Sequence, residues 1–122
     1  MQKSKQLAIK SSRDRYIEGF LSGQTVAYCE QIKTGSRLAG QITFPIAYLE
    51  PLLSLVAREG CKAKTERINS ERMSLWIYKH KLTERIISNL SSAPLSDVGI
   101  WGMGKLFGYA DYEIIKFIER PR

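Results

Sequence analysis

Residues 61–78 read CKAKTERINSERMSLWIY, and apolar and polar side chains alternate on both sides of a polar middle segment. This alternation is typical of β-strands that bury one face. We expect a hairpin that turns at residues 68–72 and pairs Thr65 with Leu75 and Ala63 with Ile77, because a one-residue slip would mix the two faces. The face turned away from the core then carries Lys62, Lys64, Glu66, Ser74, Trp76, Tyr78 and His80.

A related pattern surrounds Thr34-Gly35-Ser36 in residues 24–44. Apolar residues of one parity lie on both sides of this turn, so we expect a second hairpin and prefer it to a helix over residues 24–33. The expected core pairs are Ile32 with Leu38, Tyr28 with Ile42, and Val26 with Phe44. The opposite face would carry Ala27, Cys29, Gln31, Lys33, Arg37, Ala39, Gln41 and Thr43.

Helices are expected between and after the hairpins. The first follows Ser12, the second starts near Pro51 and stops at Gly60, and the third covers roughly residues 82–91. The fold class is therefore α+β, in the order αββαββα, with one four-stranded antiparallel sheet. We expect a single domain over residues 1–122, with a flexible basic arm (1–11), this core (12–91) and a C-terminal helical tail (94–122) that includes a helix over 110–119.

The composition favours an anionic partner. The chain has 122 residues, is 43% hydrophobic, and carries 19 basic against 12 acidic residues, a formal charge of +7. Such a balance favours nucleic acid over an acidic metabolite. No apolar stretch approaches a membrane span or the core of a signal peptide, so we expect a cytoplasmic, organellar or nucleoid protein that is not secreted. With two cysteines and one histidine, neither a disulfide framework nor a zinc site is expected, and we expect no metal and no cofactor.

Residues 16–25, YIEGFLSGQT, resemble a degraded LAGLIDADG homing-endonuclease signature, and the expected element order resembles that family's fold. Gly19 and Gly23 match the family's small interface residues, and Phe20 and Leu21 match its apolar pair. The resemblance implies a homodimer packed through Gly19, Phe20 and Gly23, with two sheets lying over the DNA major groove. It also implies either a DNA-binding regulator or a remnant of a mobile element.

The departures from the signature concern its chemistry. Gln24 stands where the family has its metal-binding acid, and Ser22 and Thr25 replace two further signature residues. Because Mg²⁺ prefers carboxylate oxygens, the resemblance implies that cleavage is lost and that no catalytic residue remains.

The polar sheet face is the candidate nucleic-acid-binding surface. Amides can read adenine, and basic side chains can contact guanine or phosphate. The candidates are Gln31, Lys33, Arg37, Gln41, Thr43, Lys62, Lys64, Ser74, Trp76 and Tyr78. An ordinary solvated face is the alternative. An exposed Trp76 would need a cover, which the C-terminal tail or a stacked base of single-stranded nucleic acid could supply.

The sequence thus predicts a homodimeric, catalytically silent protein that binds duplex DNA through its sheet, with no membrane and no small-molecule substrate. Two alternatives stay open. One is a small basic interaction protein of the immunity or inhibitor type that binds an acidic protein. The other is an active nuclease or an RNA-binding, maturase-like protein.

Overall fold

The hairpin expected at residues 61–78 lies at the centre of the fold. A computed structural model describes residues 11–92 and 96–120. In it, β2 (Lys62–Arg67) pairs antiparallel with β3 (Arg72–Tyr78). Thr65 lies opposite Leu75 and Ala63 opposite Ile77, so the predicted register is confirmed.

A third strand, β1 (Ala39–Pro45), pairs antiparallel with β3 on its other side. The strand order is β1-β3-β2, and Ile42 and Phe44 lie opposite Leu75 and Met73. The α+β class is therefore right. The four strands and the αββαββα order are wrong, because the described residues form three strands and no strand precedes β1.

The residues that were expected to form the fourth strand belong to a long helix, α2 (Ser12–Thr34). Its buried residues, Leu21, Thr25, Cys29 and Ile32, follow helical spacing, so the expected hairpin over residues 24–44 is wrong. Gly35, with φ of 88°, ends the helix instead of turning a hairpin. The N–H groups of Gly35 and Ser36 donate to the carbonyls of Ile32 and Gln31, as in a helix cap.

The remaining helices follow the sequence closely. They are the short 3₁₀ helix η1 (Ile46–Tyr48), α3 (Leu49–Arg58), α4 (Lys81–Ser92), α5 (Asp97–Leu106) and α6 (Asp111–Ile118). The predicted helices near Pro51, over 82–91 and over 110–119 are thus confirmed within two residues, and the described tail is helical. Ser11, not Ser12, caps α2 by accepting from the N–H of Asp14 at 3.0 Å. Residues 1–10 of the expected basic arm lie outside the described residues.

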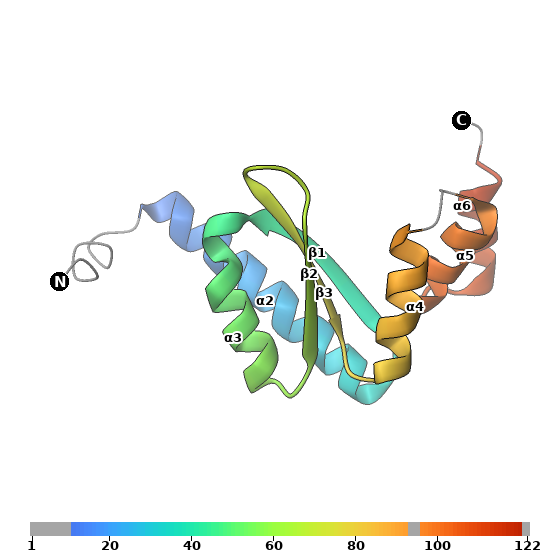
Figure 1. Cartoon of the computed structure of the whole chain (residues 1–122), viewed down its shortest axis with the longest axis horizontal. Coiled ribbons are helices and arrows are strands. Elements are labelled where there is room, and N and C mark those ends of the chain that lie inside the picture. The colour runs from blue at the N-terminus through green and yellow to red at the C-terminus, as the bar shows by residue number, and fades with distance from the viewer. Residues whose placement is uncertain (1–10, 93–95, 121–122) are drawn as a thin grey trace.

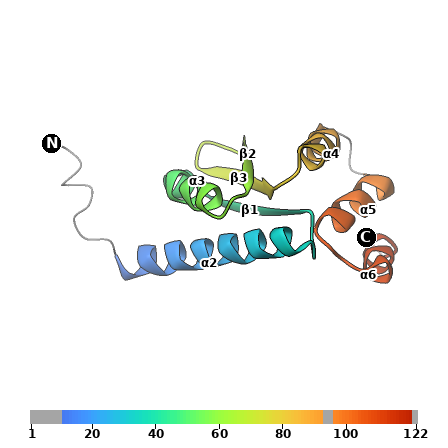
Figure 2. The same ribbon diagram turned by 90° about the horizontal axis from the view of Figure 1, so that it is seen from below.

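Helices flank both faces of the sheet (Figure 1). One face is apolar and packs on α2 and α3, through Ile42, Phe44, Leu75 and Ile77. The other face packs on α4 and α5, and we call it the α4-side face. Helix α6 packs on α5 at the far end of the molecule (Figure 2).

Candidate nucleic-acid interface

The α4-side face of the sheet brings together seven of the ten predicted binding residues. Because side chains alternate along a strand, the register places Gln41, Trp76 and Lys64 in one row across the three strands. Thr43, Ser74 and Glu66 form the next row. Tyr78 and Lys62 share the row with Ala39.

One end of this face is covered. Trp76 and Tyr78 are 2% and 4% exposed and pack with Ile87 of α4 and Leu106 of α5. The Phe107 ring stacks on Trp76 at 5.9 Å between centroids. The cover that Trp76 needs is therefore the C-terminal tail. The prediction that Trp76 and Tyr78 meet nucleic acid is not supported by this geometry, because α4 and α5 occupy their surface.

Hydrogen bonds connect the covered end to the rest of the face. The Trp76 indole donates to Glu66 Oε1 at 3.1 Å. The Gln41 amide donates to Ser74 Oγ at 2.8 Å, and Ser74 itself is buried. Burial raises the pKa of the Tyr78 hydroxyl above its usual value of 10.0, and the nearby Glu84 carboxylate raises it further. Ser74 and Tyr78 are thus part of the packing and not free to contact a ligand.

Beyond the covered end, six side chains of this face reach solvent. Thr43, Lys62 and Arg72 are exposed, and Gln41, Lys64 and Glu66 are half-buried. We call this set the open surface: Gln41, Thr43, Lys62, Lys64, Glu66 and Arg72. It combines three cations, two neutral polar side chains and one carboxylate that already accepts from Trp76.

Two members of the open surface, Glu66 and Arg72, are not among the ten predicted binding residues, and Arg72 was not expected on this face. Residues 68–72 were assigned to the turn, but β3 already begins at Arg72. There Arg72 lies opposite Pro45 of β1 and donates to Thr43 Oγ1 at 3.5 Å. Arg72 is two residues from Ser74 and four from Trp76, and this even spacing is the sequence signal that places all three side chains on the same face.

Gln31, Lys33 and Arg37 are not on the sheet, so their predicted place beside the other candidates is wrong. Gln31 and Lys33 belong to α2, because residues 24–34 are helical. Lys33 forms an ion pair with Glu59 at 3.1 Å. The Arg37 guanidinium lies 4.5 Å from the Tyr28 ring centroid and 6.0 Å from that of Phe107. It therefore links α2 to the tail.

The three residues expected at a dimer interface lie exposed on α2. Phe20 is 60% exposed, and Gly19 and Gly23 also face solvent. A Cβ atom built on either glycine would meet no other atom within 4 Å. Within one chain, then, neither glycine is needed to let another element approach closely.

Gln24, which occupies the position expected for a metal-binding acid, lies in the middle of helix α2. Gln24 is half-buried in α2, and its amide donates to the Tyr28 hydroxyl at 3.4 Å. Helix α2 continues for ten residues beyond it. Over residues 11–92 and 96–120, no three His, Cys, Asp or Glu side chains cluster as metal ligands would.

Both cysteines are free thiols in the core. The Cys61 thiol donates to the Cys29 carbonyl oxygen at 4.0 Å. Burial, with a contribution from Cys61, raises the pKa of Cys29 from 9.0 to about 12. A thiol with so high a pKa is a poor nucleophile at neutral pH.

No protein-family model matches this chain, and no curated protein sequence is significantly similar to it.

In the part of the chain that the structure describes, no helix combines the length and apolar character needed to cross a bilayer.

Proposed function

We propose that this protein binds duplex DNA through the open surface. The observation that supports the proposal is the three-strand register, which gathers Lys62, Lys64 and Arg72 on one exposed face together with Thr43 and Gln41. Cations gathered beside hydrogen-bonding side chains suit a phosphate backbone and its bases. The +7 charge of the whole chain favours the same ligand.

The open surface lies on a three-stranded antiparallel sheet, and β-sheets are among the elements that proteins place in a DNA groove. Lys62 and Lys64 are two residues apart on the edge strand, so their side chains leave the same face about 7 Å apart. We assign phosphate contacts to these lysines and to Arg72, and base-edge contacts to Thr43.

Gln41 has a smaller role in this proposal. Its amide already donates one N–H to Ser74, so one N–H and the amide oxygen are left for adenine, in an orientation that this bond restricts. Binding therefore depends more on the cations than on the amide, and it should vary strongly with salt.

The burial of Trp76 favours duplex DNA over single-stranded nucleic acid as the ligand. Proteins that bind single strands stack bases on exposed aromatic rings. Trp76, which lies opposite Lys64 on this sheet face, is 2% exposed and already stacked by Phe107. An RNA-binding, maturase-like role that depends on stacking at this face is correspondingly disfavoured.

Fluorescence anisotropy with a random duplex tests the proposal. We expect binding by micromolar protein at about 50 mM salt that weakens as salt rises. The Lys64→Gln/Arg72→Gln variant should bind at least about tenfold more weakly and lower the salt slope by about two. Lys116→Gln/Arg120→Gln, with Lys116 on α6 and Arg120 just after it, removes the same charge elsewhere and is the control. Absence of binding by the wild-type protein at low salt, or equal losses in both variants, would contradict the proposal.

The resemblance to LAGLIDADG endonucleases is retained as a proposal on narrower grounds. Its support is the match at residues 16–25, since the element order that also suggested it is not present. A Gln24→Glu variant tests the alignment with supercoiled plasmid and Mg²⁺. Metal-dependent nicking by the variant alone would support both the alignment and a silent centre, whereas nicking by the wild-type protein would favour an active nuclease.

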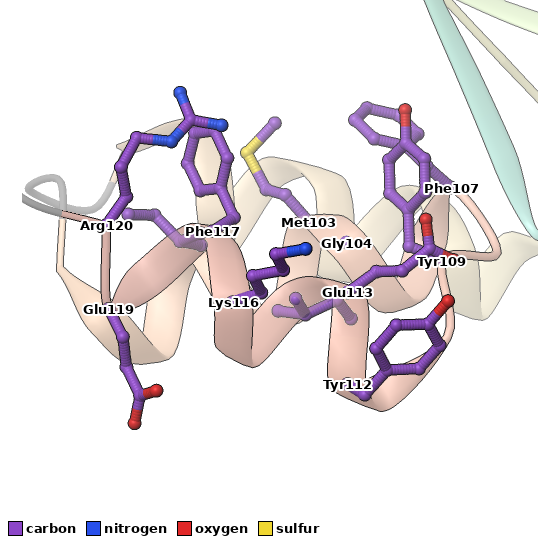
Figure 3. A pocket seen from close by; sticks show the side chains of 12 residues that line it. Met103, Gly104, Phe107, Tyr109, Tyr112, Glu113, Lys116, Phe117, Glu119 and Arg120 are labelled. Atoms are coloured by element: carbon purple, nitrogen blue, oxygen red, sulfur yellow. The ribbon is translucent and has the colours of Figure 1, made fainter.

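A second candidate function is protein binding by the tail, in line with an interaction protein. A hollow of about 940 Å³ lies between α5 and α6, and Figure 3 shows Phe107, Tyr109 and Phe117 along it. Tyrosine and phenylalanine are enriched at protein interfaces. The hollow carries Lys116 and Arg120 but also Glu113 and Glu119, so its charge gives no preference for an acidic partner.

A further inference from the structure

A second group of basic side chains lies where β3 runs into α4, at the end of the sheet where β2 begins (Figure 1). Lys79 follows the last residue of β3, Lys81 is the first residue of α4, and both are exposed. Lys62 lies opposite Tyr78, so the edge strand brings a third exposed cation next to Lys79. Arg85 is exposed one helical turn beyond Lys81. We call this set the link cluster: Lys62, Lys79, Lys81 and Arg85.

The cations of the link cluster have no ion-pair partner among the described residues. The ion pairs between described side chains join α2 to the end of α3 and α5 to α6. Two carboxylates close to the cluster are engaged with the protein itself. Glu84 interacts with the Tyr78 hydroxyl, and Glu66 accepts from the Trp76 indole. The positive charges of the cluster are therefore available to an external anion.

The link cluster continues the open surface, because Lys62 belongs to both. Arg72 begins β3, and Lys79 follows its end seven residues later. At a rise of about 3.3 Å per residue, this separation is about 23 Å. Lys64 and Lys62 lie between them, opposite the second half of β3. Phosphates of one DNA strand follow each other about every 3.4 Å along the helix axis, so this line of cations spans about six or seven phosphates.

The link cluster lies on an open part of the surface. The hollow between α5 and α6 and a second hollow, of about 550 Å³ between α2 and α3, are lined by other residues. Small ligands bind in concave sites that enclose most of their surface. An extended polyanion instead needs spaced cations on an accessible face. The cluster therefore suits a nucleic-acid backbone better than a free phosphate or a mononucleotide.

We propose that the link cluster is a second phosphate-binding region for the duplex that lies on the open surface. The DNA backbone continues from Lys62 past Lys79 to the first two turns of α4. Lys81 and Arg85 are four residues apart and lie on the same side of this helix, opposite its buried residues. The identity of the ligand rests on the proposed function, and the added region gives the duplex a direction along the sheet.

Fluorescence anisotropy with a duplex of about 20 base pairs tests this region separately from the rest of the open surface. Lys81→Gln/Arg85→Gln should weaken binding by about tenfold and lower the salt slope by about two, because each phosphate contact releases about one counterion. Its combination with Lys64→Gln/Arg72→Gln should lower the slope by about four. Lys116→Gln/Arg120→Gln removes the same charge elsewhere and should have a much smaller effect.

A charge-conserving variant separates loss of the contact from damage to α4. Lysine, arginine and glutamine have similar helix propensities, so the melting temperature of Lys81→Gln/Arg85→Gln should stay within about 2 °C of the wild-type value. Lys81→Arg/Arg85→Lys exchanges the two cations and should bind within about threefold of the wild-type protein. A loss in the exchanged variant as large as in the glutamine variant would contradict phosphate contacts at these positions.

The outcomes distinguish this inference from the proposed function. If Lys64→Gln/Arg72→Gln loses affinity but Lys81→Gln/Arg85→Gln matches the control, the open surface binds DNA and the link cluster is not part of the site. If only Lys81→Gln/Arg85→Gln loses affinity, the continuous site is wrong. Displacement of DNA by inorganic phosphate beyond that by chloride at equal ionic strength, absent from this variant, would identify a site for free phosphate and overturn the inference. A wild-type protein that binds no duplex would overturn both proposals.

Discussion

The two faces of the sheet are built differently, although they share the same three strands. The face on α2 and α3 is apolar, with Phe44, Leu75 and Ile77 fully buried. The α4-side face is apolar only where Trp76 and Tyr78 meet the tail, and beyond them it is polar and basic. The first face is devoted to packing. The second divides its area between packing and a surface that a ligand can reach.

The largest difference in the free energy of unfolding should appear between variants at two neighbouring residues of β1. Phe44 points into the core, and Thr43 points to the open surface. Phe44→Ala should lower the free energy of unfolding by about 3–5 kcal/mol, since it removes a buried ring and leaves a cavity. Thr43→Ala should change it by about 0.5 kcal/mol or less. Urea denaturation measures both, and similar losses would break the comparison.

The next effect concerns how the tail is attached to the α4-side face. Gly108 has a φ of 85°, and a Cβ there would collide with the carbonyl oxygen of Ser36. Gly108→Ala should cost about 2–4 kcal/mol, from left-handed strain plus the collision. Gly35→Ala is the control, because Gly35 has the same backbone conformation and open space, and it should cost only about 1 kcal/mol. Faster hydrogen exchange in the Gly108 variant at the Leu38 amide, which donates to the Leu106 carbonyl, would locate the damage.

A smaller effect is expected from pH on the apolar side. The pKa of Cys29 is raised from 9.0 to about 12, so the unfolded chain loses this proton at a lower pH than the folded one. The stabilisation is complete below pH 9 and is lost as the pH rises toward 12. Between about pH 8 and 10 the free energy of unfolding should fall by about 1.4 kcal/mol from this group. Urea titrations of a Cys29→Ala variant should show a shallower decline. An equal decline in both proteins would refute the assignment.

The smallest stability effect should come from the open surface. Lys64→Gln/Arg72→Gln should alter the free energy of unfolding by no more than about 0.5 kcal/mol, because neither side chain is buried. The same variant is expected to lose DNA affinity. A large loss of stability would mean that these cations support the fold and would remove the distinction between the two faces.

The hairpin at residues 61–78 was predictable because local alternation and tertiary burial agree there. Ala63, Leu75 and Ile77 share a parity, and the structure puts all three on one face. The placement of Lys62 and Lys64 on the other face followed from the same rule. Arg72 was missed only because the turn was drawn one residue too long.

Residues 24–34 were not predictable in the same way. Val26, Tyr28 and Ile32 share strand parity, but Glu30 has that parity too and would have been buried in the expected hairpin. The helix instead buries Thr25 and Cys29, which the parity argument did not count as core. The Thr25 hydroxyl is satisfied inside the helix, since it donates to the Leu21 carbonyl at 2.8 Å. Here the helical period prevailed over a short apparent alternation.

The cover on Trp76 lay beyond local patterns. A strand pattern shows that Trp76 faces away from the apolar core, but it does not show what lies above it. Trp76 is covered by Leu106 and Phe107, about thirty residues later in the chain. A backbone hydrogen bond holds this segment in place, since the Leu38 N–H donates to the Leu106 carbonyl at 2.9 Å. Only the tertiary structure divides this face into a covered part and an open part.

Helix α2 and the open surface lie on opposite sides of one sheet. Occupation of one therefore leaves the other accessible.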